Sequence, residues 1–196
     1  MTRPWRTLFK ALLVATAAAL ASDALAHSAS DAYLSLDTET RTDSSAARKT
    51  VIHGQWDIAL RDLDFVIKLD DDGDGNIDWR ELRGHQTAIA RYALERLSFL
   101  GDGKPCKVSL TRQLVDNHAD GAYAALFFDI ACADSPQRLT LDYRLFFAID
   151  PSHRAILISR SGNETATAVL SPQNAKVDLK LFPGKGGDIK RPANMR

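Results

Sequence analysis

The sequence lacks the features that define several large classes of protein. After residue 26 no apolar run approaches the about 20 residues that a transmembrane helix needs. Basic and acidic residues both number 25, so no surplus of positive charge favours nucleic acid. Nucleophile-elbow, Walker and C-x-x-C motifs are also absent. We therefore expect neither a nucleic-acid-binding protein, nor an enzyme, nor an integral membrane protein.

The first 26 residues have the pattern of a secretion signal. Three basic residues come first: Arg3, Arg6 and Lys10. An alanine-rich apolar stretch over 11–21 follows, and Ala24-Leu25-Ala26 has the small-x-small form of a cleavage site. A membrane anchor is the alternative, but the apolar stretch is short for one. We expect cleavage near Ala26, a mature chain that begins at His27, and a periplasmic or secreted location.

Cysteine is scarce: Cys106 and Cys132 are the only two. An even number of cysteines in an exported protein favours a disulfide, and two buried free thiols are the alternative. The polar stretch 117–121 predicts a hairpin turn. If the hairpin is centred on Ala119, Cys106 faces Cys132. The same register pairs Val108 with Ile130, Leu110 with Phe128, and Leu114 with Ala124. Closing this loop would stabilise the fold by roughly 3 kcal/mol in the chain-entropy model.

One short segment, residues 70–81, is crowded with acids at a fixed spacing. Its spacing matches the twelve-residue calcium loop of an EF-hand. Gly75 stands where the loop turns sharply, and Ile77 is the inward apolar residue. Calcium prefers six to eight oxygen ligands, and this loop offers them. The expected ligands of Ca²⁺ are Asp70, Asp72, Asp74, Asn76, Asp78 and Glu81.

Apolar residues at helical intervals flank this loop on both sides. Upstream they include Phe65 and Leu69, and downstream they continue through Leu97 to Leu100. A solvated, disordered acidic patch is the alternative, but it would not require this spacing. No second loop of the type occurs, and His85 lies where paired hands usually carry an apolar residue. We therefore expect a structural calcium ion rather than a switch.

Most of the remaining chain alternates apolar and polar residues, which indicates strands. We expect about eight strands, one of them running from Leu139 to Ile149, and a polar loop over 40–49. The predicted class is α+β: an antiparallel β-sandwich or barrel with an EF-hand helix-loop-helix inserted at about 57–100. The predicted organisation is a signal peptide over 1–26, a single domain over 27–182 and a disordered tail over 183–196. A docking tail is the alternative for the last segment.

Three segments together resemble a family of exported bacterial domains. They are residues 26–34 (AHSASDAYL), residues 54–64 (GQWDIALRDLD) and the calcium loop. In that family the domain is similar to the soluble N-terminal region of hydrogenase- and urease-accessory proteins, some of which are nickel permeases. The resemblance implies calcium binding at Asp70, Asp72, Asp74, Asn76 and Glu81, with Asp78 as a sixth ligand. Independently of the resemblance, we expect an exported or membrane protein as partner.

These observations predict a secreted calcium-binding protein that serves as a binding or accessory module. The alternative is a periplasmic metal-handling accessory associated with a membrane transporter. In that case the terminal amine and imidazole of His27 would bind nickel or copper, although the histidines lack a tight ligand spacing. An enzyme with a site assembled from distant residues is a third possibility that sequence patterns do not reveal.

Overall fold

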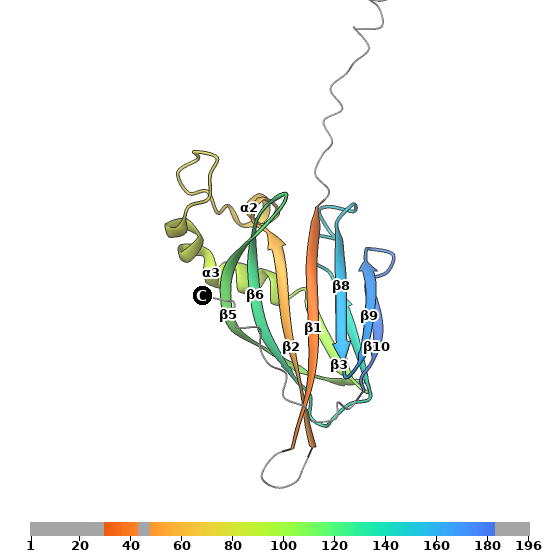
Figure 1. Cartoon of the computed structure of the whole chain (residues 1–196). Coiled ribbons are helices and arrows are strands. Elements are labelled where there is room, and N and C mark those ends of the chain that lie inside the picture. The colour runs from red at the N-terminus through yellow and green to blue at the C-terminus, as the bar shows by residue number, and fades with distance from the viewer. Residues whose placement is uncertain (1–29, 43–47, 183–196) are drawn as a thin grey trace, which may run out of the picture.

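Two β-sheets packed face to face form the body of the molecule (Figure 1). The computed structural model describes residues 30–42 and 48–182. One sheet has six strands in the order β5 (Lys107–His118), β6 (Gly121–Ala131), β2 (Arg48–Ala59), β1 (Asp31–Thr42), β8 (Arg154–Ser161) and β9 (Glu164–Leu170). The other has four strands in the order β10 (Lys176–Lys180), β7 (Arg138–Tyr143), β3 (Leu97–Gly101) and β4 (Lys104–Pro105). Neighbouring strands are antiparallel except β1 and β8, which are parallel.

The core lies between the two sheets because each long strand turns alternate apolar residues inward. In β1 the buried residues are Ala32, Leu34 and Leu36. Aromatic rings join the two layers. Trp56 of β2 meets Tyr143 of β7 edge to face with 5.4 Å between ring centroids. The outer face of the six-stranded sheet therefore carries the intervening residues of β1, β2, β5 and β6.

Gly54 leaves room for an aromatic ring in this core. It pairs with Phe128 on the neighbouring strand β6. A Cβ at Gly54 would lie 2.2 Å from the Phe128 ring, far inside contact distance. The ring therefore covers the glycine backbone, and β2 needs a residue without a side chain here.

The two helices of the described residues lie between β2 and β3 in the chain: α2 (Leu60–Ile67) and α3 (Trp79–Leu94). Figure 1 shows α3 behind β5 and β6, where it contacts β5 of one sheet and β3 of the other. Strands hold 54% of the described residues and helices 17%. The prediction of an α+β class with an inserted helix-loop-helix is therefore wrong, since the fold is mostly β. The strand arrangement is not wholly antiparallel either.

Two element boundaries differ from the sequence prediction for the same physical reason. The second helix was expected to reach Leu100, but it ends at Leu94 and residues 97–101 form β3. Leu97 and Phe99 alternate into the core there and pair with β7. The strand expected from Leu139 to Ile149 stops at Tyr143, and Phe146 takes a φ of +59° to place its ring in the core. Packing against the two sheets overrides local periodicity at both places.

The hairpin of β5 and β6 carries the predicted disulfide, Cys106–Cys132, with 4.3 Å between the Cα atoms. Near the cysteines the register is as expected, because Val108 pairs with Ile130. Nearer the turn it is shifted by one residue, so that Leu114 pairs with Ala125 rather than Ala124. The shift comes from a β-bulge at Thr111, where two residues oppose one.

No helix in the described part of the chain is long and apolar enough to cross a membrane. The strands β1 and β2 extend to Thr42 and back to Arg48, so the polar loop expected over 40–49 is shorter than predicted. The predicted division into signal peptide, single domain and tail stays a prediction, because residues 1–29 and 183–196 lie outside the described residues.

Candidate metal centre

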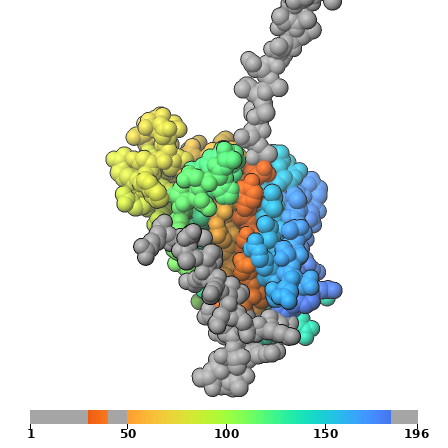
Figure 2. Space-filling view, in the orientation of Figure 1, coloured from red at the N-terminus to blue at the C-terminus, as the bar shows by residue number. Residues whose placement is uncertain are grey.

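The segment 70–81, called the acidic loop below, is anchored at both ends and projects between them. Leu69, just before it, is fully buried, and Ile77 within it packs against the core. Figure 2 shows this part of the chain, in yellow, standing out from the body of the sandwich. The apolar anchors fix the ends of the loop, so its acidic residues are held together on the surface.

Three of the predicted ligands lie together. One carboxylate oxygen from each of Asp70, Asp72 and Asp74 can be chosen so that all three lie within 4.8 Å of one another. Asp70 is partly buried, and the other two are exposed. Like charges this close repel, and a divalent cation is the ordinary way to offset that repulsion.

Backbone N–H groups already surround the first of these carboxylates. Gly73 donates to Oδ1 of Asp70 at 2.7 Å, and Gly75 donates to Oδ2 at 2.9 Å. Both glycines have positive φ, +73° and +83°, which turns the chain back toward Asp70. These hydrogen bonds, that from Gly75 contributing more than that from Gly73, hold the pKa of Asp70 below its usual range. Asp70 therefore stays ionised and available as an oxygen donor.

Glu81 links the beginning and the end of the acidic loop. Its Oε1 accepts the N–H of Asp71 at 2.9 Å, and its Oε2 accepts the N–H of Asp78 at 2.8 Å. In return Asp78 caps α3 by accepting the N–H groups of Arg80 and Glu81 at 2.7 and 2.8 Å. This reciprocal pair is a capping box, and the Glu81 N–H lowers the pKa of Asp78.

The structure thus brings some of the six predicted ligands together and gives the others a structural position. Asp78 and Glu81 are not part of the three-carboxylate group. Asn76 is not part of it either, and its N–H donates to Oδ1 of Asp74 at 2.7 Å. Carboxylate oxygens suit hard cations, so these residues could hold a metal ion such as Ca²⁺ or Mg²⁺.

His85 connects α3 to the acidic loop. It stands at a position where paired EF-hands usually carry an apolar residue. Its Nε2 lies 3.0 Å from Oδ1 of Asp71, an acid of the loop that is not part of the three-carboxylate group. The polar residue at this position therefore contacts the loop of its own chain.

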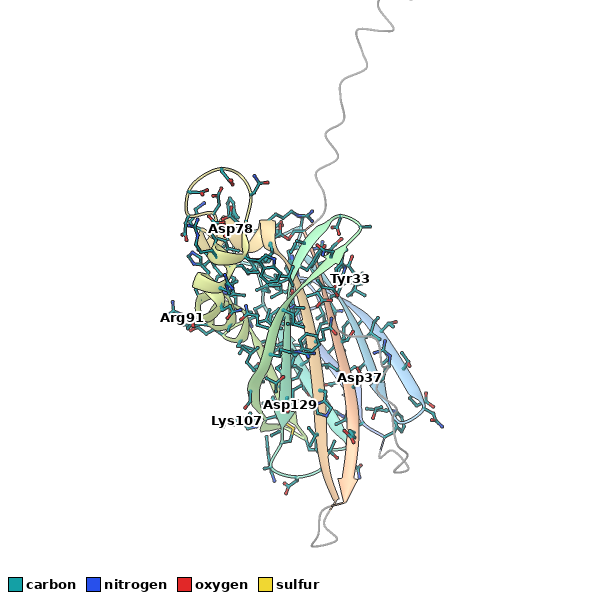
Figure 3. All side chains as sticks on the ribbon, turned by 60° about the vertical axis from the view of Figure 1, so that its left-hand side comes forward. Tyr33, Asp37, Asp78, Arg91, Lys107 and Asp129 are labelled. Carbon is teal, nitrogen blue, oxygen red and sulfur yellow. A yellow bond between two sulfur atoms is a disulfide. The ribbon has the colours of Figure 1, made fainter. Side chains whose placement is uncertain are left out.

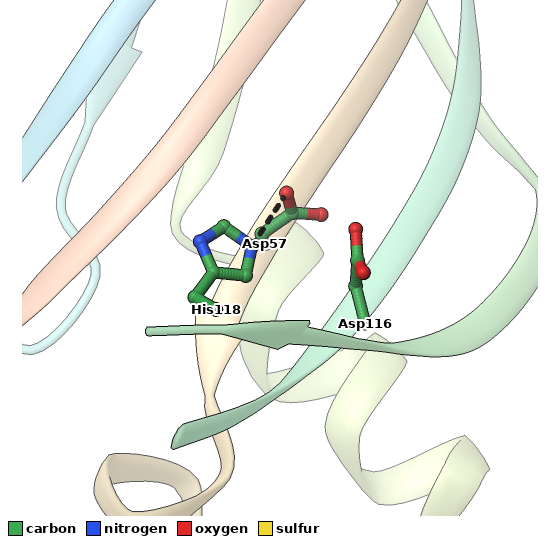
Figure 4. Close-up of side chains that lie close together, drawn as sticks. All are labelled: Asp57, Asp116 and His118. Atoms are coloured by element: carbon green, nitrogen blue, oxygen red, sulfur yellow. Dashed lines mark ion pairs between the residues drawn. The ribbon is translucent and has the colours of Figure 1, made fainter. Parts of the chain in front are cut away.

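A second set of side chains that could hold a metal ion was missed by the sequence reasoning. Asp57 of β2 and Asp116 and His118 of β5, called the outer-face group below, offer three ligand atoms within 4.8 Å of one another (Figure 4). The two-residue spacing of Asp116 and His118 on a strand could have suggested a shared face. Nothing in the sequence places Asp57 beside them, because the contact depends on the sheet order and on the bulge at Thr111.

A buried chain of hydrogen bonds joins four elements of the fold. His153 is fully buried, with its Nε2 at 2.7 Å from the Tyr143 hydroxyl and its Nδ1 at 2.7 Å from the Ser30 hydroxyl. Ser30 donates its proton to Oδ2 of Asp62 at 2.8 Å. Ser30 therefore accepts from Nδ1–H of His153, and Tyr143 donates to Nε2.

The direction of these hydrogen bonds differs from that of a serine–histidine catalytic pair. In such a pair the imidazole accepts the serine proton, whereas Ser30 gives its proton to Asp62. Burial lowers the pKa of His153 to about 4, so the ring is neutral near pH 7. Burial also raises the pKa of Asp62. The four side chains hold the start of β1, α2, the end of β7 and the start of β8 together.

Two predicted features, His27 and the signal peptide, fall outside the described residues. The disulfide within the chain indicates an oxidising, exported compartment. No protein-family model matches the sequence, and no curated protein matches it.

Proposed function

We propose that the protein is a calcium-binding module of an exported compartment, and that its acidic loop holds one Ca²⁺ ion. The observation that carries this proposal is the meeting of the Asp70, Asp72 and Asp74 carboxylates within 4.8 Å on a loop that is anchored at both ends. Hard oxygen donors at this spacing suit Ca²⁺.

The remaining ligands would come from the second half of the acidic loop. Asn76 would contribute its backbone carbonyl, Asp78 a direct or water-mediated oxygen, and Glu81 its two carboxylate oxygens. Glu81 supports this role because it is nearly buried, with 3% exposure, and already contacts both ends of the loop. When bound, the ion would neutralise charges that otherwise repel one another.

The proposed role of the ion is structural. It would join the end of α2 to the start of α3, two short elements that have few contacts with each other. Outside the cytosol an affinity of about 10⁻⁴ to 10⁻³ M, the order of extracellular calcium modules, would keep the site filled. An ion that is always bound stabilises a fold rather than switching it.

The module would act on another exported or membrane protein. Two large exposed apolar side chains support this. Phe65 of α2, before the loop, is 69% exposed, and Trp79, within the loop at the start of α3, is 63% exposed. The resemblance to hydrogenase- and urease-accessory proteins stays a prediction. The nickel or copper alternative through His27 also stays a prediction, because that residue lies outside the described part of the chain.

Terbium luminescence tests the binding site directly. Trp79 lies inside the acidic loop, so excitation of tryptophan should sensitise a bound Tb³⁺, and Ca²⁺ should displace it. Asp72→Asn should weaken binding by about tenfold or more, because one charged ligand is lost. Asp71→Asn is the matched control: it removes an acid of the same loop that faces His85 and should change the affinity by only about twofold.

Thermal unfolding tests the structural role. Calcium at one hundred times its dissociation constant should raise the free energy of unfolding by about 2.7 kcal/mol relative to protein in chelator. A protein that neither sensitises terbium nor binds calcium at millimolar concentration would contradict the proposed function. Binding without any change in melting temperature would contradict only the structural role.

A further inference from the structure

The outer-face group lies on the side of the six-stranded sheet that faces away from the core. The face that β5 presents changes across the bulge at Thr111. Leu110, before it, pairs with the core residue Phe128. Arg112, after it, pairs with Phe127 on the outer face. The bulge therefore turns the even-numbered residues of the second half of β5 outward. Asp116 and His118 are thereby carried to the face where Asp57 of β2 lies (Figure 4).

The distance between two of these side chains matches that between two ligands of one small cation. Nε2 of His118 lies 3.4 Å from Oδ2 of Asp57. Two donors bound at about 2.0–2.1 Å to a tetrahedral zinc ion are separated by about 3.3–3.4 Å. Asp116 offers the third donor within 4.8 Å from an exposed position on the edge strand. Only the Asp116 side chain needs to move appreciably to complete a three-donor set.

Asp57 is held in place before any ion arrives. Asp57 is 7% exposed. The side-chain amide of Gln55 donates to both of its carboxylate oxygens, at 3.0 and 3.2 Å. A buried carboxylate oriented by a neighbouring amide is the arrangement by which proteins fix metal ligands.

Aromatic rings hold the imidazole of His118. The Tyr33 ring stacks against it with 4.9 Å between centroids, and the Tyr123 ring lies at 4.1 Å from it. The Tyr123 hydroxyl donates in turn to Asp120 in the hairpin turn at 2.8 Å. Figure 3 shows Tyr33 on the sheet and Asp78 at the start of α3, so this group and the acidic loop occupy different parts of the molecule.

An ion pair between Asp57 and His118 does not account for the whole group. Asp116 brings a second negative charge beside a buried carboxylate, and two like charges there disfavour each other. A divalent cation would offset both carboxylates at once. Calcium is a poor candidate, because it takes six to eight oxygen ligands and one donor here is an imidazole nitrogen.

We propose that Asp57, Asp116 and His118 bind a first-row divalent transition metal of the zinc type, at a site separate from the acidic loop. Imidazole and carboxylate donors together suit this class of ion. Three protein donors leave one position of a tetrahedral ion for water or for a donor from a partner. The proposal does not depend on calcium binding by the acidic loop.

Zinc calorimetry on the purified protein, with calcium present at millimolar concentration, tests the site. His118→Ala and Asp57→Asn should each weaken zinc binding by about 100-fold or more, and Gln55→Ala by about tenfold, because it only positions Asp57. His53→Ala is the matched control. His53 lies on the same sheet face between two acids, Asp129 at 2.7 Å and Glu39 at 3.4 Å, but uses a different ring nitrogen for each. This control should retain the wild-type affinity.

A measurement on the unaltered protein covers the case in which a variant does not fold. Paramagnetic Co²⁺ added to the wild-type protein should shift or broaden the ring signals of Tyr33 and Tyr123 and leave those of Tyr143 unchanged. Zinc should reverse the effect by competition. The proposal is overturned if these rings do not respond, or if folded His118→Ala and Asp57→Asn proteins bind zinc as tightly as wild type. Equal losses in the His53→Ala control would overturn it as well.

Discussion

The acidic loop and the outer-face group assemble similar donors by different routes. In the loop, the carboxylates lie within twelve consecutive residues, and backbone N–H groups of the same segment position them. In the outer-face group, the donors come from β2 and β5, two strands that are not adjacent in the sheet. The first arrangement depends on local conformation. The second depends on strand order and register, so the same mutation should affect the two regions very differently.

Mild acid should weaken both regions together, because protonation of the buried His153 lowers the stability of the whole fold. Unfolded His153 has a pKa near 6.5, whereas the folded residue has a pKa of about 4. Between these values the unfolded state binds a proton that the folded state does not, so stability falls as the pH falls. The loss should total about 3 kcal/mol by pH 4.

His153→Gln isolates this contribution, because glutamine can accept from Tyr143 and donate to Ser30 without titrating. Burial raises the pKa values of Asp57 and Asp62. Above pH 3.8 these two residues make stability rise as the pH falls, but this contribution is the same in the wild type and the variant. The slope between pH 6.5 and 4 should therefore be smaller in the variant by up to about 1.4 kcal/mol per pH unit. Parallel stability curves, from urea unfolding at several pH values, would argue against a neutral buried His153.

A single glycine should disturb the acidic loop and spare the outer-face group. Gly75 has a φ of +83°, which costs a residue with a Cβ about 1–2 kcal/mol, although no atom lies within 4 Å of the added methyl. Gly75→Ala should weaken calcium or terbium binding by roughly five- to thirtyfold and leave zinc binding unchanged.

Gly84→Ala is the matched glycine control, since it lies within α3 with ordinary helical geometry and open space around it. It should stabilise the protein by about 1 kcal/mol, the smallest effect of the series and of opposite sign. If both substitutions had the same effect on terbium binding, the positive φ of Gly75 would not matter for the site.

The residues that sequence reasoning placed well are those whose position depends on near neighbours. The turn between β5 and β6 and the disulfide between Cys106 and Cys132 follow from alternation within one hairpin. The acidic loop is likewise described by spacing alone, and three of its predicted ligands lie together. In each case local geometry carries the information.

The errors arise where distant segments decide the outcome. The helical spacing of Leu97 and Leu100 led us to predict a helix there. The segment forms a strand instead, because it pairs with β7. The α+β class was wrong because the two helices are short beside the two sheets that they accompany. Asp57 was not recognised, because a contact between β2 and β5 requires the order of strands in the sheet. Sequence periodicity contains none of these long-range pairings.

The disulfide has a consequence for the edge of the larger sheet. Cys106 stands where the chain leaves β4 of one sheet for β5 of the other, and the two sulfurs pack against Gly101 of β3. β5 is an edge strand whose one strand neighbour is β6. The disulfide secures the end of β5 that begins at Lys107, whereas the turn to β6 secures the other end, where Asp116 and His118 lie. Reduction would therefore loosen the edge of the sheet near Lys107 first and leave both donor sets in place.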